Sequence, residues 1–519
     1  MEFSFAISIG LLGLLGFLEI VSASVPLFLT PYLEKGQIKE ARGHSRVTEE
    51  NTTGVTIPES YSGFITVDKH LKNHLFFWFF PSALNASAPL LIWLNGGPGV
   101  SSMLGLFWEN GPLELRSDRK DFQKREHSWA DPFAMLYIDN PVDVGYSFTE
   151  SGDAGHRSTQ KGITKDLYSF IEQFYKMFPE YKKRELYIGG QSYAGKYVPS
   201  IAYYIDEQLQ KNRTDIPLTG VYIGGPFFDP PVQTLSYYEY IYSMGVISHA
   251  QKVEYRQDTL KLIQQFHAGE LKNVELKEVL DKILRNLGLA TLDNYVTGNP
   301  ADYMLVNECM NTPRIRHAVH AGNRTFHIIN RAVNAKFGGD LFVSLKSEMA
   351  ELMNKYKVLI YTGDYDVIVS SVMVESALLT TPWRHQAEYN ATRRSMWWSA
   401  EGQLRGFYSK TDQFCRVVVK GAGHQTPHDQ PQASLEMMRE FIQHGCVAIK
   451  ATGEGTQCPK RVTESNSRNV SPSNSRNASS RSSGRKKTPR NSSWSFGADT
   501  VRTVVIFLTA TLARHLGRL

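Results

Sequence analysis

Short apolar runs that alternate with longer helix-like stretches constrain the fold of this chain more than any other feature. The runs, rich in β-branched and aromatic residues, are Leu90–Leu94, Ala134–Ile138, Leu186–Ile188, Gly220–Ile223, Val358–Tyr361 and Val417–Val419. Such runs are typical of strands buried on both faces of a mostly parallel sheet. Helix candidates separate them, Gln160–Phe178 and Gln432–Gln443 among them, which favours an α/β fold. Ahead of the runs, Tyr61–Val67 and Leu75–Phe80 alternate like strands and predict a hairpin.

The alternation stops between about residues 245 and 350. This stretch is charged and helix-prone, with Lys252–Phe266 and Val274–Leu287 as amphipathic helix candidates and no evident buried strand. We expect a helical lid insertion there that covers the carboxyl ends of the sheet strands. Residues 24–54 are polar and without periodicity, so the sequence predicts a loose leader ahead of a main domain at 55–447.

The N-terminus has the pattern of a secretory signal. Phe3–Leu18 is almost entirely apolar and Val21-Ser22-Ala23 supplies small residues for cleavage, which predicts a signal peptide over residues 1–23. Because no Lys or Arg precedes the apolar stretch, an uncleaved membrane anchor stays an alternative.

Two further features are typical of an exported protein. Asn-x-Ser/Thr sequons, candidates for glycosylation, occur in the body of the chain at Asn51, Asn85, Asn212, Asn323 and Asn390. The cysteines form an even set that allows two disulfides in three connectivities: Cys309, Cys415, Cys446 and Cys458. We therefore expect the chain to enter the secretory pathway.

The net charge of +6 comes from the end of the chain. From Cys458 onward there are twelve Lys or Arg residues and two acids, so the rest is slightly acidic and no nucleic-acid partner is expected. Residues 459–519 are rich in Ser, Asn and Arg and are expected to be disordered. They close with Thr503–Ala513, an apolar run shorter than the roughly 20 residues that span a bilayer. Asn491-Ser492-Ser493 is similar to a lipid-anchor signal, but the basic residues around the final run disfavour that interpretation.

A serine follows the third apolar run, in a turn of small residues. Leu186–Ile188 leads into Gly189-Gly190-Gln191-Ser192-Tyr193-Ala194-Gly195 and then into a helix-compatible stretch. Strand, Gly-x-Ser-x-small and helix in this order are typical of a nucleophile elbow, whose tight turn requires small residues near the serine. The motif alone is weak, because a Gly-rich loop with a surface serine has the same pattern.

The last two apolar runs lead to residues that complete a catalytic triad. One is followed by Asp364 and Asp366, and the other by His424. Catalytic groups of open α/β sheets gather at the carboxyl ends of strands, and the chain order Ser, Asp, His is that of the α/β-hydrolase fold. An alternative, in which Asp364 caps a turn and His424 is an ordinary loop residue, leaves two such placements unexplained. The sequence therefore predicts Ser192, Asp366 and His424 as a triad on an α/β-hydrolase fold.

Five segments match the motifs of one family. Trp93–Gly99 reads WLNGGPG, Gln191–Gly195 reads QSYAG, Gly363–Asp366 reads GDYD, Gly421–Pro431 reads GAGHQTPHDQP and Asp139–Ser147 reads DNPVDVGYS. These segments resemble motifs of serine carboxypeptidases. The second segment reads ESYAG in that family, and the last reads DxPVGxGFS. The chain resembles that family, and its vitellogenic-like branch in particular, over roughly residues 55–447.

The resemblance implies an enzyme that removes single residues from peptide C-termini through an acyl-enzyme. Ser192 would attack the scissile carbonyl, His424 would act as base and then acid, and Asp366 would orient the imidazole. The backbone N–H groups of Gly97 and Tyr193 would form the oxyanion hole.

The resemblance also implies a site for the substrate's terminal carboxylate, made by Asn95, Gly96, Glu109 and Gln191. A carboxylate bound beside Glu109 requires a proton on one of the two groups, which implies activity at acidic pH and a secreted or lysosomal location. The family's glutamate before the nucleophile is Gln191 here. Since Gln191 donates a hydrogen bond without a shared proton, we expect weaker loss of activity toward neutral pH than in relatives with glutamate. Asp143 is a second departure, at a position where glycine is usual.

The resemblance implies peptide or protein substrates, no cofactor and no metal. Relatives form dimers, so a homodimer stays an alternative for this chain. Two other functions also stay open. The intact triad would serve an acyltransferase or esterase equally well, and a non-enzymatic scaffold that stabilises partner hydrolases needs no chemistry. Release of an amino acid from a blocked dipeptide separates the peptidase from both.

Overall fold

The computed structural model describes residues 25–48, 57–116, 122–270, 287, 291–297 and 302–447. The predicted signal peptide, the tail from residue 448 onward and, apart from Leu287, the helix candidate Val274–Leu287 lie outside these residues. The described residues belong to one compact unit that ends at Thr452.

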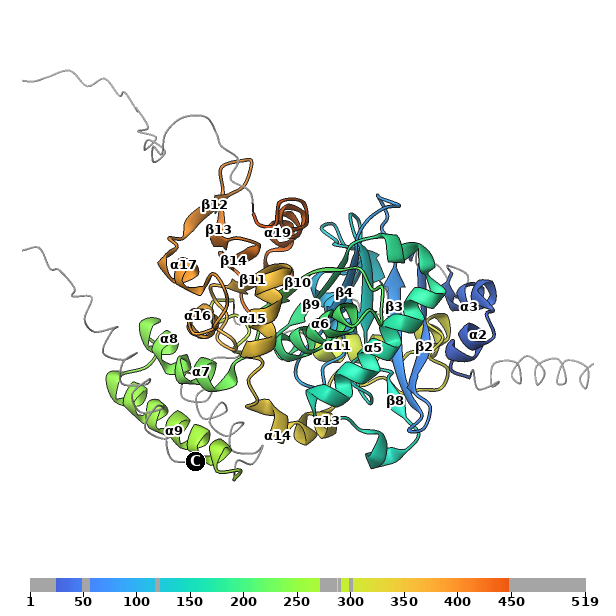
Figure 1. The fold of residues 1–519 in the computed structure, drawn as a ribbon, viewed down its shortest axis with the longest axis horizontal. Coiled ribbons are helices and arrows are strands. Elements are labelled where there is room, and N and C mark those ends of the chain that lie inside the picture. Colours follow the sequence, from blue (N-terminus) through green and yellow to red (C-terminus); the bar gives the residue numbers. More distant parts are fainter. Residues whose placement is uncertain are drawn as a thin grey trace, which may run out of the picture. The chain divides into compact units, whose positions relative to one another are not determined.

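A mixed sheet of 12 strands runs through the described part of the chain (Figure 1). Its order is β1-β2-β3-β7-β4-β9-β10-β11-β14-β13-β12, with β8 beside β3. The bounds are β1 (Arg46–Val47), β2 (Ser60–Asp68), β3 (Asn73–Phe80), β4 (Leu90–Leu94), β7 (Ala134–Ile138), β8 (Phe148–Thr149), β9 (Leu186–Gln191), β10 (Leu218–Gly224), β11 (Lys357–Gly363), β12 (Ser395–Trp398), β13 (Leu404–Thr411) and β14 (Phe414–Val419). A separate pair consists of β5 (Leu113–Leu115) and β6 (Phe122–Lys124).

The centre of the sheet is parallel and its edges are antiparallel. β7, β4, β9, β10, β11 and β14 pair in parallel with one another. β1, β2 and β3 at one edge, and β13 and β12 at the other, are antiparallel. All six predicted apolar runs and the predicted hairpin are strands of this sheet. The predicted α/β class with a mostly parallel sheet is confirmed.

Alternate residues of each strand fill two cores, one on each face of the sheet. In β3, Leu75 and Phe77 pack on one face, whereas Phe76 and Trp78 pack on the other. Because successive side chains of a strand point to opposite faces, strands covered on both sides are continuously apolar.

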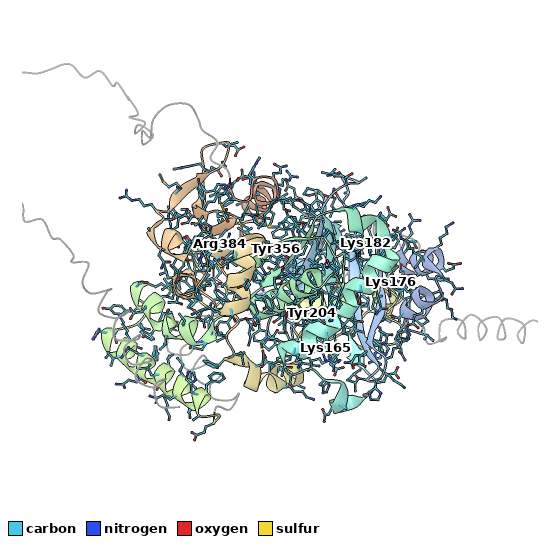
Figure 2. All side chains as sticks on the ribbon, in the orientation of Figure 1. Lys165, Lys176, Lys182, Tyr204, Tyr356 and Arg384 are labelled. Carbon is cyan, nitrogen blue, oxygen red and sulfur yellow. A yellow bond between two sulfur atoms is a disulfide. The ribbon has the colours of Figure 1, made fainter. Side chains whose placement is uncertain are left out.

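Helices cover both faces of the sheet (Figure 1). One face packs against α5 (Gln160–Met177), α6 (Ala194–Gln210), α15 (Lys346–Lys355) and α16 (Ser371–Leu379), and the other against α11 (Tyr303–Met310), α12 (Pro313–Ala318) and α19 (Pro431–His444). In α5, a predicted helix, the Phe170 ring lies 5.5 Å from that of Phe77 in β3. The opposite side of α5 exposes Lys165 and Lys176 (Figure 2).

Between β10 and β11 the described residues form helices and no strand. Besides α11, α12 and α15, they contain α7 (Pro230–Leu235), α8 (Tyr237–Ser243), α9 (His249–His267), α13 (Arg331–Lys336) and α14 (Gly338–Leu341). The predicted helix Lys252–Phe266 is part of α9, which begins with a capping box between Ser248 and Gln251. The helical stretch starts directly after β10, ahead of the predicted boundary near residue 245.

The segment expected to be a loose leader is ordered where it is described, so that expectation is wrong. It contains α2 (Thr30–Glu34), α3 (Ile38–Ser45) and β1. Leu29 and Leu33, four residues apart, are buried in the core. The backbone groups of Leu27 and Leu29 bond with those of Phe64 in β2 at 2.9 Å. These contacts are made with distant residues, so local periodicity gave no signal for them.

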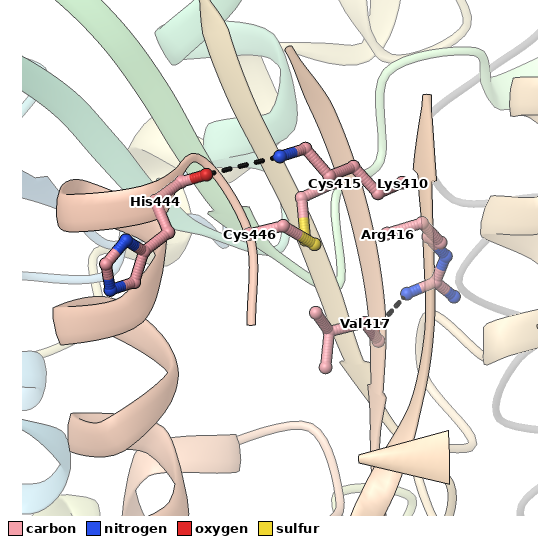
Figure 3. The surroundings of a disulfide bond; sticks show 6 residues. All are labelled: Lys410, Cys415, Arg416, Val417, His444 and Cys446. Atoms are coloured by element: carbon pink, nitrogen blue, oxygen red, sulfur yellow. Dashed lines mark hydrogen bonds between the residues drawn. A yellow bond between two sulfur atoms is a disulfide. The ribbon is translucent and has the colours of Figure 1, made fainter. Parts of the chain in front are cut away.

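Two predicted export features can be located. Cys415 of β14 and Cys446 after α19 form a disulfide, with Cα atoms 5.3 Å apart (Figure 3). Cys309 is buried in α11, and Cys458 lies outside the described residues. The sequon residues are exposed at Asn85, Asn212, Asn323 and Asn390, while Asn51 is outside the described part.

No helix in the described residues is long and apolar enough to cross a membrane. Nor do those residues contain a group of three or more His, Cys, Asp or Glu side chains that could hold a metal ion.

Candidate active site

Ser192 occupies a strained turn between β9 and α6. Its φ of 64° is a left-handed conformation that is uncommon for residues other than glycine. Its N–H donates to the Gly224 carbonyl at 2.9 Å, and its own carbonyl accepts from Gly195 N–H at 2.8 Å. The side chain is only partly buried. This geometry is that of a nucleophile elbow, which holds the hydroxyl clear of the sheet.

Asp366 and His424 lie side by side, after β11 and β14 respectively. His424 Nδ1 is 2.7 Å from Asp366 Oδ2, and both residues are buried. Asp366 Oδ1 accepts from the N–H groups of Ile368 and Val369 at 2.8 and 2.9 Å. A carboxylate on Nδ1 favours the tautomer that carries its proton there and leaves Nε2 available as a base.

The charge of Asp366 also changes the acidity of the imidazole. Burial lowers the pKa of His424, but the charge and hydrogen bond of Asp366 outweigh burial, and the pKa is raised above its usual value.

Gln191 connects this pair directly with the serine turn, and Gly225 does so through its neighbour Gly224, whose carbonyl accepts from Ser192 N–H. Gln191, directly before Ser192, donates from Nε2 to the His424 carbonyl at 2.5 Å. Gly225 faces the pair, since a Cβ there would lie 3.1 Å from Asp366 Oδ2 and 3.4 Å from the His424 ring. The structure thus gathers all three residues of the predicted triad at the carboxyl ends of β9, β11 and β14.

The loop after β4 lies against the serine turn. A Cβ on Gly96 would be 2.5 Å from Tyr193 N and 2.7 Å from the Gln191 carbonyl oxygen, so only glycine permits this approach. Gly97 follows with a φ of 106°. The two residues predicted to supply oxyanion-hole N–H groups, Gly97 and Tyr193, therefore belong to segments that touch.

Asn95 and Glu109 form a buried pair beside this loop. Asn95 Nδ2 donates to Glu109 Oε1 at 3.1 Å. The amide is held in that orientation because Trp93 Nε1, at 2.7 Å, and Gly105 N–H, at 3.0 Å, both donate to Asn95 Oδ1. The sequence placed Trp93 in a motif but assigned it no role.

The other Glu109 oxygen, Oε2, is buried without a hydrogen-bond partner. Burial raises the pKa of Glu109 to about 7, although the hydrogen bond from Asn95 acts in the opposite direction. At acidic pH Glu109 is therefore neutral and its carboxyl group can donate a hydrogen bond.

A buried ion pair lies behind the serine turn, and the sequence did not predict it. Asp340 of α14 accepts from Tyr193 OH at 2.6 Å and from Gln160 Nε2 at 2.7 Å. Lys196 Nζ, fully buried, lies 2.8 Å from Asp340 Oδ2. Burial raises the pKa of Asp340, but the charge of Lys196 together with the hydrogen bonds from Lys196, Tyr193 and Gln160 outweighs burial, and the pKa is lowered. Asp340 comes from the helical insertion and lies in no recognisable motif, which is why sequence reasoning missed it.

Asp139 supports the loop after β7. It accepts from Ser101 Oγ at 2.5 Å, Ser102 N–H at 3.1 Å and Tyr146 N–H at 3.0 Å. Asp143 in the same loop has a φ of 67°, a left-handed conformation that glycine adopts more readily than aspartate.

Residues of the insertion reach the loops of the acid and the histidine. His424 N–H donates to the Asp293 carbonyl at 2.6 Å, and Tyr240 OH donates to the Asp364 carbonyl at 2.8 Å. Asp364 itself accepts from Gly421 N–H at 2.7 Å and so braces one loop on the other.

Known proteins resemble the chain along most of its length. A family model described as serine carboxypeptidase matches residues 51–444. The probable serine carboxypeptidase CPVL of Rattus norvegicus is 37% identical over 438 residues, covering 81% of this chain and 90% of that protein. The venom serine carboxypeptidase of Apis mellifera is 35% identical, covering 81% and 91%. The vitellogenic carboxypeptidase of Aedes aegypti is 33% identical, covering 80% and 89%.

Among solved structures, Kex1Δp, a prohormone-processing carboxypeptidase from Saccharomyces cerevisiae, superimposes with a TM-score of 0.70 at 22% identity, covering 78% of this chain and 96% of that one. This likeness confirms the predicted α/β-hydrolase fold. The family match extends over more than half of the sequence, and the resemblance that the motifs indicate is confirmed. The chain therefore belongs to the serine carboxypeptidase family of hydrolases.

Proposed function

We propose that this enzyme cleaves the C-terminal peptide bond of peptides and proteins at acidic pH, with Ser192, His424 and Asp366 as its triad. The observation that carries the proposal is the buried hydrogen bond between His424 and Asp366 beside the strained Ser192 turn. A base oriented by a carboxylate, next to a hydroxyl held clear of its sheet, is the arrangement that acyl transfer requires.

In the proposed first step, Ser192 Oγ bonds to the scissile carbonyl carbon while its proton passes to His424 Nε2. The developing oxyanion accepts hydrogen bonds from the N–H groups of Gly97 and Tyr193. When the C–N bond breaks, His424 gives the proton to the departing amino acid and an acyl-enzyme remains. Water then attacks that ester, again with His424 as base, and Ser192 regains its proton.

The substrate's terminal carboxylate binds at Asn95, Gly96, Glu109 and Gln191. Glu109 Oε2 is a buried carboxyl oxygen without a partner, and a bound carboxylate can accept its proton. Because the pKa of Glu109 is about 7, this donor is present at acidic pH and is lost as pH rises through 7. Gln191 supplies amide N–H groups at any pH, one of which already donates to the His424 carbonyl.

The proposed compartment is the secretory pathway, with the mature protein secreted or lysosomal. The Cys415–Cys446 disulfide supports it, because such bonds persist in oxidising compartments. The exposed sequons at Asn85, Asn212, Asn323 and Asn390 support it as well. The acid optimum expected from Glu109 suits a lysosome. Peptides and proteins are the proposed partners, and the helical insertion, whose residues contact the loops of Asp366 and His424, is the proposed lid.

Release of free C-terminal amino acid from an N-blocked dipeptide tests this function. We would measure it from about pH 4 to 8 for the wild type and for Ser192→Ala. We expect Ser192-dependent release that is fastest at acidic pH. A folded wild-type enzyme that hydrolyses esters but releases no amino acid would point to acyltransferase or esterase chemistry. No activity on either substrate would leave the scaffold role.

A further inference from the structure

Arg416 in β14 is a buried charge that the proposed mechanism does not use. Its side chain is fully buried, and it lies across the strand from its neighbour Cys415, whose disulfide occupies the other face (Figure 3). Arg416 Nη2 donates to Thr362 Oγ1 at 2.9 Å and to Ser371 Oγ at 3.0 Å. Nη1 donates to a carbonyl of its own strand.

The two hydroxyls flank the loop that carries the proposed triad acid. Thr362 is the next-to-last residue of β11, and Ser371 is the first residue of α16. Residues 363–370 between them include Asp366. A single guanidinium that bonds both hydroxyls therefore fixes the two ends of this loop relative to each other.

The same side chain belongs to the strand that leads to the proposed base. β14 ends at Val419, and His424 follows five residues later. We propose that Arg416 is a positioning residue that clamps both ends of the Asp366 loop onto the strand that leads to His424. This inference rests on the proposed function, which assigns Asp366 and His424 their roles.

Burying a charged arginine side chain in a strand costs free energy of desolvation. Its nearest carboxylate, Glu375 Oε2, is 3.7 Å from Nε and is shared with Arg394. Burial lowers the pKa of Arg416 to about 10. An apolar residue of similar volume at such a site is often neutral or stabilising, so filling the core does not account for the charge.

The fork shape of the guanidinium accounts for an arginine at this buried position. Nη2 donates to both hydroxyls while Nη1 donates to a carbonyl of its own strand, so the two arms of the fork join the loop ends to β14. A lysine ammonium is a compact point charge on a flexible stem and has one nitrogen for these three acceptors. Positions within the triad are sensitive to displacement, since a misplacement of about 1 Å lowers the rate on the order of 100-fold.

Two variants test the clamp, and the first of them keeps the arginine. The double variant Thr362→Val/Ser371→Ala deletes both acceptors, and Arg416→Lys deletes the fork. Ser376→Ala is the matched control, because Ser376 lies in the same helix α16 and donates only within it, to the Val372 carbonyl at 2.9 Å. The readouts are kcat and KM for the blocked dipeptide, and the downfield proton NMR signal of His424 Nδ1–H, identified by its loss in Asp366→Asn.

We expect the double variant and Arg416→Lys to lower kcat about tenfold or more, with KM nearly unchanged and the downfield signal weakened or shifted. Ser376→Ala should match the wild type in all three quantities. If the double variant also matches the wild type, the clamp is refuted. If Arg416→Lys does not fold, the double variant decides. If the wild type releases no amino acid, the proposed function fails, but the NMR signal of the double variant still decides whether Arg416 positions the pair.

Discussion

Glu109 is the residue whose protonation we expect to control substrate binding. With a pKa of about 7, raised from 4.5 by burial, it is neutral in acid and ionised at higher pH. An ionised Glu109 repels the substrate's carboxylate, so KM should rise up to about tenfold per pH unit above 7.

KM of the wild type and of Glu109→Gln, measured from about pH 5 to 8.5, checks this prediction. The glutamine variant should show no such rise, because its side chain does not titrate. A dipeptide amide, which lacks the carboxylate, is the control substrate and should show no rise with either enzyme. An equal rise for the amide would assign the effect to another group.

Gln191 should widen the pH range of this enzyme. Its amide donates to the His424 carbonyl at any pH, whereas a glutamate there could do so only when protonated. We expect Gln191→Glu to lose kcat/KM at a lower pH than the wild type, by about one pH unit or more, because two carboxyl groups would then share the subsite. Identical pH profiles of kcat/KM for the two enzymes would contradict this role, and Gln191→Asn tests whether the amide alone is sufficient.

At the scale of elements, the strands could be predicted where both faces are buried. Leu90–Leu94 and Ala134–Ile138 are continuously apolar and have the predicted bounds. β13 (Leu404–Thr411) was missed, because this antiparallel strand near the sheet edge mixes buried and exposed positions, and its sequence is neither continuously apolar nor regularly alternating.

The residues of the candidate site also fall into those that the sequence could predict and those that it could not. Residues in strand-end motifs, such as Ser192 and His424, could be predicted because short local patterns place them. Asp340 and Asp293 could not, because their contacts with Tyr193 and His424 depend on how a long insertion packs over the sheet. The assignment of the triad itself stays a prediction until Ser192→Ala is assayed.

The pair Lys196 and Asp340 should be important for stability, since it ties α14 of the insertion to α6. Asp340→Asn leaves the buried ammonium of Lys196 without its counter-charge, and we expect the free energy of unfolding to fall by about 3–5 kcal/mol. Removing both charges in Asp340→Asn/Lys196→Met should restore part of that loss. Urea unfolding of the three proteins checks this, and a double variant that is less stable than the single one would contradict it.

Across the whole molecule, the sheet brings distant parts of the sequence to one end. Ser192, Asp366 and His424 follow β9, β11 and β14, and the sheet order in this region is β9, β10, β11 and β14. Cys415 in β14 and Cys446, just after α19, are joined by a disulfide (Figure 3). The two cysteines are 31 residues apart in the sequence, and His424 lies in the segment between them.

Stability of the whole protein should therefore depend on the redox state of its surroundings. In the chain-entropy model, cross-linking a loop of 31 residues contributes about 3–4 kcal/mol, because it restricts the unfolded chain. We expect Cys415→Ala/Cys446→Ala to lower the free energy of unfolding by that amount in urea, and reductant to lower that of the wild type similarly. Reductant added to the double variant is the control for the remaining cysteines and should change nothing. If reductant destabilises both proteins equally, the stabilising bond is a different one, and the Cys415–Cys446 pair contributes little to holding the histidine loop in an oxidising compartment.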